Sequence, residues 1–244
     1  MNKKALKKYL LDLIFPNKCP VCMRAIRWDK FICEECKAQL PFIEKGEFCI
    51  KCGRQHNENE HCESKKNYDE VIGVLKYKGK SRKAIYNFKN RYGLNLGEFA
   101  APYIYKTLED EELIKSIDCI TFVPMHKKKE YKRGYNQAEE FARALADELG
   151  VPLIKSMLEH RKSKSSQHNL SGEDRKLAAK QTYYLGKTKR PEDFKTVIIA
   201  DDVFTTGSTL DTCAELLKQT GFERVICAAI CITPKKDNEK DDDE

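Results

Sequence analysis

Two adjacent acids stand directly before a short loop that is rich in hydroxyl groups. Asp201 and Asp202 follow the apolar run 197–200, and Gly207 lies in the middle of the loop. The hydroxyl groups of the loop belong to Thr205, Thr206, Ser208 and Thr209. Because a glycine lets the backbone approach a ligand closely, and the N–H groups of a following helix attract an anion, the loop predicts a phosphate site.

The two acids repel a phosphate, so they need another part of the same ligand. Vicinal hydroxyl groups or a magnesium ion suit paired carboxylates, and a phosphorylated sugar combines both requirements. Alternatively, the acids and threonines are only the turn and capping residues of a strand that leads into a helix. The sequence contains neither G-x-x-x-x-G-K-[ST] nor a G-x-G-x-x-G after a strand, which argues against a P-loop ATPase and a Rossmann dehydrogenase.

The cysteines offer a second kind of chemistry. Seven of the eleven lie between positions 19 and 62, and such clustering favours metal binding over disulfides. Two Cys-x-x-Cys pairs supply four thiolates from two tight turns, which is the donor set of a structural zinc site. These ligands are Cys19, Cys22, Cys33 and Cys36.

A third pair, Cys49 and Cys52, is followed by His56, His61 and Cys62. A second zinc ion would need the three cysteines and one histidine, unless the pairs are shared differently. His56 is the easier ligand geometrically, because His61 adjoins Cys62. The alternative is that both histidines are solvated and bind nothing.

Composition and charge limit the class of protein. The 244 residues are 41% hydrophobic, which supports a folded core, and the net charge is +7. The segment 235–244 carries three bases and six acids, so the remaining 234 residues carry +10. This surplus favours anionic partners, either phosphate-bearing small molecules or nucleic acid. We expect 235–244 to be disordered.

The apolar run 9–15 is short and is interrupted by Asp12. We therefore expect no signal peptide and no insertion in a membrane. This places the chain in the cytoplasm, where thiols stay reduced and available to zinc. The remaining cysteines are expected to be buried packing residues, at Cys119, Cys213, Cys227 and Cys231.

Hydrophobic periodicity predicts the elements that position these residues. Buried strands are expected at 71–77, 118–123, 196–200 and 224–232, and helices at 3–14, 81–92, 96–108, 134–150 and 208–221. Alternating strands and helices predict a mainly parallel sheet flanked by helices. The expected organisation is an N-terminal helix (1–16), a zinc-binding module (17–66), an α/β domain (67–234) and the acidic tail (235–244).

The segment VIIADDVFTTGSTL (197–210) resembles the phosphoribosyl pyrophosphate (PRPP) binding loop of type I phosphoribosyltransferases. The resemblance implies a type I phosphoribosyltransferase-like fold. It also implies that Asp201 and Asp202 hold the ribose hydroxyls, and that 205–209 hold the 5-phosphate. Ala200 stands where the family usually has a bulkier aliphatic residue.

The segment VPMHKKKEYKRGYNQ (123–137) resembles the ComF group of phosphoribosyltransferase-like proteins, which begins with zinc-ribbon knuckles. By this resemblance, Pro124, Met125 and His126 lie near the pyrophosphate of PRPP, and Arg133 and the lysines 127–129 neutralise its charge. The alternative is a solvated basic loop.

A third segment, RKSKSSQHNLSGEDR (161–175), resembles the mobile loop that closes over the site in such enzymes. Gln167, Leu170, Ser171 and Arg175 match the pattern of the group, whereas Lys164 replaces the usual threonine. The resemblance implies that Gln167 and Arg175 assist catalysis together with the two acids.

Two functions are compatible with the sequence. The first is an enzyme that transfers phosphoribosyl from PRPP, with magnesium, to an acceptor that the sequence does not name. The second is a non-catalytic adaptor in DNA uptake and competence, which binds single-stranded DNA or a helicase. Aromatic residues interleaved with bases, which would stack on unpaired bases, are sparse in 17–64.

Overall fold

The computed structural model describes Leu6, Tyr9, Asp12, Ile14 and the ranges 16–56, 62, 65–90, 93–161 and 182–234. The tail 235–244 and the expected catalytic residues Gln167 and Arg175 lie outside this part. Among the described residues, no helix combines the length and the apolar character that crossing a bilayer requires.

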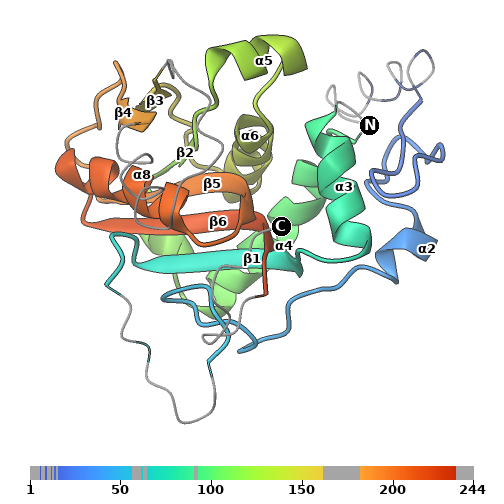
Figure 1. The fold of residues 1–244 in the computed structure, drawn as a ribbon, viewed down its shortest axis with the longest axis horizontal. Coiled ribbons are helices and arrows are strands. Elements are labelled where there is room, and N and C mark those ends of the chain that lie inside the picture. Colours follow the sequence, from blue (N-terminus) through green and yellow to red (C-terminus); the bar gives the residue numbers. More distant parts are fainter. Residues whose placement is uncertain are drawn as a thin grey trace, which may run out of the picture.

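A four-stranded parallel sheet forms the centre of the fold, in the order β1-β6-β5-β2 (Figure 1). Each strand is an almost continuous apolar run, as parallel strands buried on both faces require. The bounds are β1 Glu70–Lys76, β2 Cys119–Phe122, β5 Thr196–Phe204 and β6 Arg224–Ile232.

Helices cover both faces of the sheet. One face packs against α3 Lys80–Lys89, α4 Leu96–Asp110 and α6 Gln137–Leu149, and the other against α8 Ser208–Gln219. The short 3-10 helix η1 (Ile114–Ser116) leads into β2. The mainly parallel sheet flanked by helices confirms the fold class predicted from the sequence.

Strand β5 distributes its side chains alternately to the two faces. Ile198 and Ala200 belong to the core on the α6 side, and Val197 and Ile199 to the core on the α8 side. Side chains in a strand alternate between the two faces. The next two residues, Asp201 and Asp202, therefore also point to opposite faces.

The sequence analysis placed the end of β5 at position 200, and this was wrong. β5 pairs with β6 as far as Phe204, which lies opposite Ile232. β2, on the other edge, stops at Phe122 opposite Ala200. The two acids are therefore held inside a strand that is paired on one edge only.

The predicted helix 134–150 begins later than expected, and a separate helix precedes it. The basic segment expected to be a loop forms α5 (Lys127–Arg133), which ends at Gly134 with a φ of +82°. The side chain of Asn136 then caps α6, because its Oδ1 accepts a hydrogen bond from the N–H of Ala138 at 3.0 Å. Gly134 therefore ends α5 and separates it from α6.

Two further strands were not predicted. β3 (Leu158–His160) pairs antiparallel with β4 (Tyr183–Leu185) beside α8 (Figure 1). Each has only three residues, which is too short for a periodic pattern to appear in the sequence.

The first part of the cysteine-rich module, which carries the first two Cys-x-x-Cys pairs, shares its core with the α/β domain. Cys19 and Val21 are completely buried, in the same cluster as Phe88 of α3. Asn95 donates a hydrogen bond from Nδ2 to the carbonyl of Phe31 at 2.7 Å. The only regular element of this part is the short helix α2 (Glu34–Lys37), as far as the structure describes the module. The module is therefore built into the domain.

The second part of the module, which carries the third Cys-x-x-Cys pair, runs along the edge of β1 that is not paired with β6. The N–H of Ile43 donates to the carbonyl of Val74 at 3.0 Å, and the N–H of Val71 donates to the carbonyl of Ile50 at 2.6 Å. Such a covering segment protects an edge strand from pairing with another chain.

Replacing Asn95 by alanine tests how firmly the module is docked. Asn95 is 9% exposed, and without its amide the carbonyl of Phe31 loses a buried donor. We expect the free energy of unfolding to fall by about 1–3 kcal/mol in chemical denaturation. The exposed Tyr86 provides a control, because its replacement by alanine should change stability by less than about 0.5 kcal/mol. Equal stabilities of the two variants would contradict the docking.

Candidate functional site

A cleft of about 270 Å³ opens where β2 ends and the chain turns into α5. It lies at the carboxyl ends of the parallel strands, where α/β sheets bind ligands. Seven residues predicted from the sequence line it, namely Pro124, Met125, His126, Lys129, Arg133, Asp201 and Thr209. Segments far apart in the sequence therefore meet at one place.

Asp201 lines the cleft from the α8 side of β5. Its Oδ1 accepts a hydrogen bond from the N–H of Asp202 at 2.8 Å. Burial raises the pKa of Asp201 well above its ordinary value, and the negative charge of Asp202 raises it further. The acid pair is thus costly in the ligand-free protein.

Asp202 points to the other face and is 5% exposed. Its Oδ2 forms an ion pair with Nζ of Lys89 at 2.7 Å, and its Oδ1 accepts from Nε2 of Gln137 at 3.4 Å. Both partners also line the cleft. Neither was predicted as a site residue: Gln137 stood in the segment 123–137, but no sequence signal marked Lys89.

The hydroxyl-rich loop lies beside the cleft. Gly207 has a φ of +74°, and its carbonyl accepts from the N–H of Asp211 in the first turn of α8. The hydroxyls of Thr206 and Ser208 lie 3.0 Å apart. Of the predicted phosphate ligands only Thr209 lines the cleft, whereas Thr205, Thr206, Gly207 and Ser208 do not.

Helix α5 brings positive charge to the cleft. Lys129 and Arg133 line the cleft, and the guanidinium of Arg133 donates to Oε1 of Gln137. His126 caps the helix, because its Nδ1 accepts from the N–H of Lys128 at 3.1 Å. The cleft is therefore lined both by Asp201 and by the basic residues of α5.

Three aromatic rings close one end of the cleft. The ring of His160 lies 5.4 Å from that of His126 and 5.3 Å from that of Tyr183, both in edge-on geometry. Burial lowers the pKa of His160, so its imidazole is neutral at pH 7. Sequence reasoning missed His160 and Tyr183 because it missed the strands β3 and β4 that carry them.

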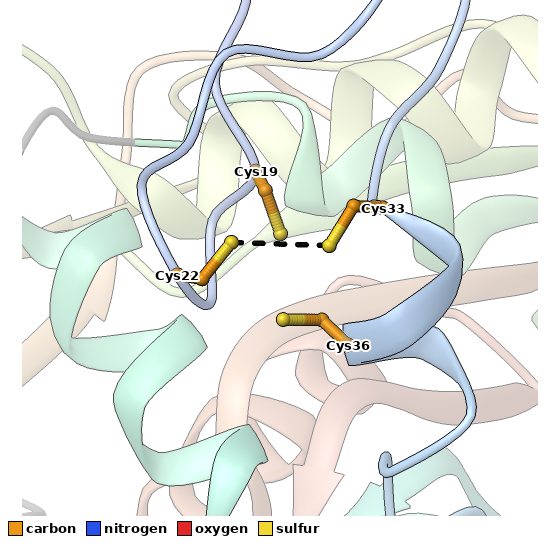
Figure 2. Close-up of side chains that lie close together, drawn as sticks. All are labelled: Cys19, Cys22, Cys33 and Cys36. Atoms are coloured by element: carbon orange, nitrogen blue, oxygen red, sulfur yellow. Dashed lines mark hydrogen bonds between the residues drawn. The ribbon is translucent and has the colours of Figure 1, made fainter.

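The four cysteines of the first two pairs converge on one point (Figure 2). Their sulfur atoms all lie within 4.8 Å of one another, and Sγ of Cys22 is 3.8 Å from Sγ of Cys33. A tetrahedral zinc with bonds of about 2.3 Å places its sulfur ligands roughly 3.8 Å apart. The donor set Cys19, Cys22, Cys33 and Cys36 therefore fits a zinc ion.

A second cluster unites Cys49, Cys52, His56 and Cys62. Their ligand atoms also lie within 4.8 Å of one another, and Sγ of Cys52 is 3.0 Å from Nε2 of His56. These are the four residues that the sequence analysis preferred for a second zinc, whereas His61 lies outside the described residues. Three thiols and one imidazole also suit zinc.

The other four cysteines are fully buried in the core, as expected. Burial raises the pKa of Cys119 to about 12, and it raises the pKa of Cys213 well above its ordinary value. Such thiols are poor nucleophiles at pH 7, so these cysteines act as packing residues.

Two domain families each match a part of this chain. The double zinc ribbon domain family matches residues 10–65, and the phosphoribosyl transferase domain family matches residues 136–244. The first family agrees with the two cysteine clusters, and the second contains the acid pair and its loop.

Three relatives match most of the chain. Competence protein F of Haemophilus influenzae is 26% identical, over 80% of this chain and 87% of its own. DNA utilization protein YhgH of Salmonella typhimurium is 27% identical, over 88% and 90%. Competence protein ComFC of Bacillus subtilis is 24% identical, over 79% and 80%. These matches confirm the resemblance drawn from the motifs.

The raised pKa of Asp201 predicts a stability that depends on pH. The folded protein retains a proton that the unfolded chain has lost, so stability falls as the pH rises above the ordinary carboxyl pKa of about 4. Replacing Asp201 by asparagine should therefore raise the melting temperature at pH 8, and the gain should shrink towards pH 4.

Circular dichroism melts between pH 4 and pH 8 measure this gain. The exposed Asp193 serves as a control, because Asp193→Asn removes one acid without changing the cleft. If the melting temperature of Asp201→Asn lies below that of the wild type at pH 8, the buried carboxylate of Asp201 does not destabilise the fold and the prediction is wrong.

Proposed function

We propose that this chain, a member of the ComF family of proteins with a double zinc ribbon and a phosphoribosyltransferase domain, binds PRPP with magnesium and transfers its phosphoribosyl group. The observation that carries this proposal is that Asp201 lines the same cleft as Arg133 and Lys129. An acid wall and a basic wall in one cleft suit a ligand with hydroxyl groups at one end and a diphosphate at the other.

The parts of PRPP are assigned to the walls by their chemistry. By the family resemblance, the ribose hydroxyls donate to the carboxylates of Asp201 and Asp202, of which only Asp201 lines the cleft in the ligand-free protein. The 5-phosphate accepts from the loop 205–209 at the N-terminus of α8. The pyrophosphate, with its magnesium, lies against 124–126 and the basic residues of α5. Lys89 and Gln137 hold the carboxylate of Asp202 in place.

In the reaction, the bond between ribose C1 and the pyrophosphate oxygen breaks, and the acceptor atom forms a bond to C1. The electron pair leaves with pyrophosphate, whose growing negative charge Arg133 and Lys129 stabilise. Magnesium adds further charge neutralisation when it enters with PRPP. The assignment of Gln167 and Arg175 to catalysis stays a prediction from the sequence.

We further propose that each cysteine cluster holds a structural zinc ion. Each offers four protein ligands and leaves no position for water or substrate, which distinguishes structural from catalytic zinc. Reduced thiols of this kind suit a reducing compartment, so the cytoplasm is the proposed location.

Calorimetric titration with PRPP and magnesium tests the first proposal. We expect binding by the wild type and a loss of affinity of about 100-fold in the double variant Asp201→Asn, Asp202→Asn, since both carboxylates lose charged hydrogen bonds. Asp193→Asn, with an exposed acid, should bind like the wild type. If the wild type does not bind, or the double variant binds equally well, the proposal is wrong.

A second function, binding of single-stranded nucleic acid, is favoured by the borders of the same cleft. Tyr131 of α5 is 92% exposed and Tyr86 of α3 is 68% exposed, and each stands among exposed basic residues. Both helices also supply a lysine to the cleft, Lys89 from α3 and Lys129 from α5. Exposed aromatic rings among bases are the platform on which unpaired bases stack.

Fluorescence anisotropy with a labelled oligothymidylate tests this surface. The double variant Tyr86→Ala, Tyr131→Ala should bind about 10- to 100-fold more weakly, because stacking contributes roughly 1–3 kcal/mol per base. Lys195→Ala, at the opposite end of β5, should have little effect. An unchanged affinity of the tyrosine variant would exclude this surface and leave a protein partner, such as a helicase, as the alternative.

A further inference from the structure

One buried ring separates the second cysteine cluster from the phosphate loop. A Cβ added at Gly53 would lie 2.6 Å from Cε1 of Phe204, and a Cβ added at Gly207 would lie 2.7 Å from its Cζ. Gly53 directly follows the cluster residue Cys52, and Gly207 is the centre of the loop. The ring of Phe204 thus fills the space between the two backbones.

Tyr68 joins the same contact. Its ring meets that of Phe204 edge-on at 6.1 Å, and its hydroxyl donates to the carbonyl of Cys52 at 3.4 Å. The same hydroxyl oxygen would be 3.0 Å from a Cβ on Gly207. Tyr68 and Phe204 are 3% and 2% exposed, so neither ring has room to move independently.

Hydrogen bonds form a second connection. The backbone N–H of Asn67 donates to Oδ1 of Asp211 at 2.7 Å, and its side-chain Nδ2 donates to the same oxygen at 3.2 Å. Asn67 lies five residues after Cys62 of the second cluster, and Asp211 lies in the first turn of α8. The helix that follows the phosphate loop is therefore tied to the same part of the chain.

The first cysteine cluster is tied to other elements. Asn87 of α3 donates to the carbonyl of Pro20 at 2.7 Å, and Asn95, before α4, donates to the carbonyl of Phe31. The two clusters thus support different parts of the domain. Within the described residues, only the second is connected to the loop, through Phe204 and Tyr68.

We infer that the second cysteine–histidine cluster, when it holds its metal, sets the conformation of the phosphate loop through Phe204 and Tyr68 as positioning residues. That the loop binds a phosphate rests on the proposed function. The packing connection between the cluster and the loop does not depend on that function.

The physical reason lies in the way four ligands fix a chain. A metal that joins Cys49, Cys52, His56 and Cys62 holds the backbone of Gly53 against Phe204. Without the metal, nothing holds the four ligands together. The backbone of Gly53 then no longer supports its side of the Phe204 ring. Gly207 then loses the surface that holds the N–H groups of the loop in place for an anion.

Hydrogen exchange of the peptide 204–212, followed by mass spectrometry, tests the link without any ligand. In Cys52→Ser, with zinc content measured on the same sample, we expect exchange of this peptide to be at least about fivefold faster than in the wild type. Cys22→Ser is the matched control, because it removes the same atom from the first cluster and should leave the peptide unchanged. Equal exchange in Cys52→Ser and the wild type would overturn the inference.

A second variant keeps the test valid if Cys52→Ser folds poorly. Phe204→Leu leaves both sets of metal ligands intact, so it should retain two zinc ions and still accelerate exchange of 204–212. In the double variant the two effects should not add, because both substitutions break the same contact. Additive effects, or no acceleration by Phe204→Leu, would contradict the role of the ring.

Two ligands separate this inference from the proposed function. In Phe204→Leu, the dissociation constant of ribose 5-phosphate should rise roughly 10-fold or more, because a misplaced loop binds poorly. That of magnesium pyrophosphate, which contacts the other wall, should not change. An equal loss for both ligands would indicate general damage and overturn the inference. If the wild type binds neither ligand, the proposed function is wrong. The hydrogen-exchange result then still shows whether the second cluster sets the conformation of the phosphate loop.

Discussion

The unequal pairing of the two edges of β5 determines most of what this protein can do. β6 stays paired with β5 as far as Phe204, whereas β2 leaves the other edge after Ala200. The strand therefore stays rigid through its two acids while one of its edges becomes open to a ligand. The same arrangement sends Asp201 to the α8 face and Asp202 to the α6 face, so one backbone segment supplies acids to two layers of the fold.

Burial of two adjacent acids is a local conflict that the surrounding structure compensates. Lys89 and Gln137 stabilise Asp202 from the α3 and α6 side. Asp201 is attracted by the charge of Lys89, but burial and the negative charge of Asp202 outweigh this attraction and raise its pKa. Proteins commonly accept a cost of this kind where a ligand is to be bound. The basic wall formed by α5 then offers the opposite charge in the same cleft.

The cysteine-rich module supports the α/β domain at two separate places. Its first cluster shares the core with α3, and its second part covers the edge of β1 and reaches the phosphate loop. A metal site without an open position has no chemistry of its own, so its effect on function must pass through packing. The contact of Gly53 with Phe204 offers one such route.

The sequence by itself determined the local features: the four buried strands, the Cys-x-x-Cys pairs, and the acids with their hydroxyl-rich loop. Each depends on residues that are close neighbours in the chain, so spacing and periodicity reveal them. Only the tertiary structure brought Lys89 to Asp202, placed His160 and Tyr183 in the cleft, and put Phe204 between two glycines. These contacts join positions up to about 150 residues apart, and no local pattern encodes which distant side chains the folding of the sheet will bring together.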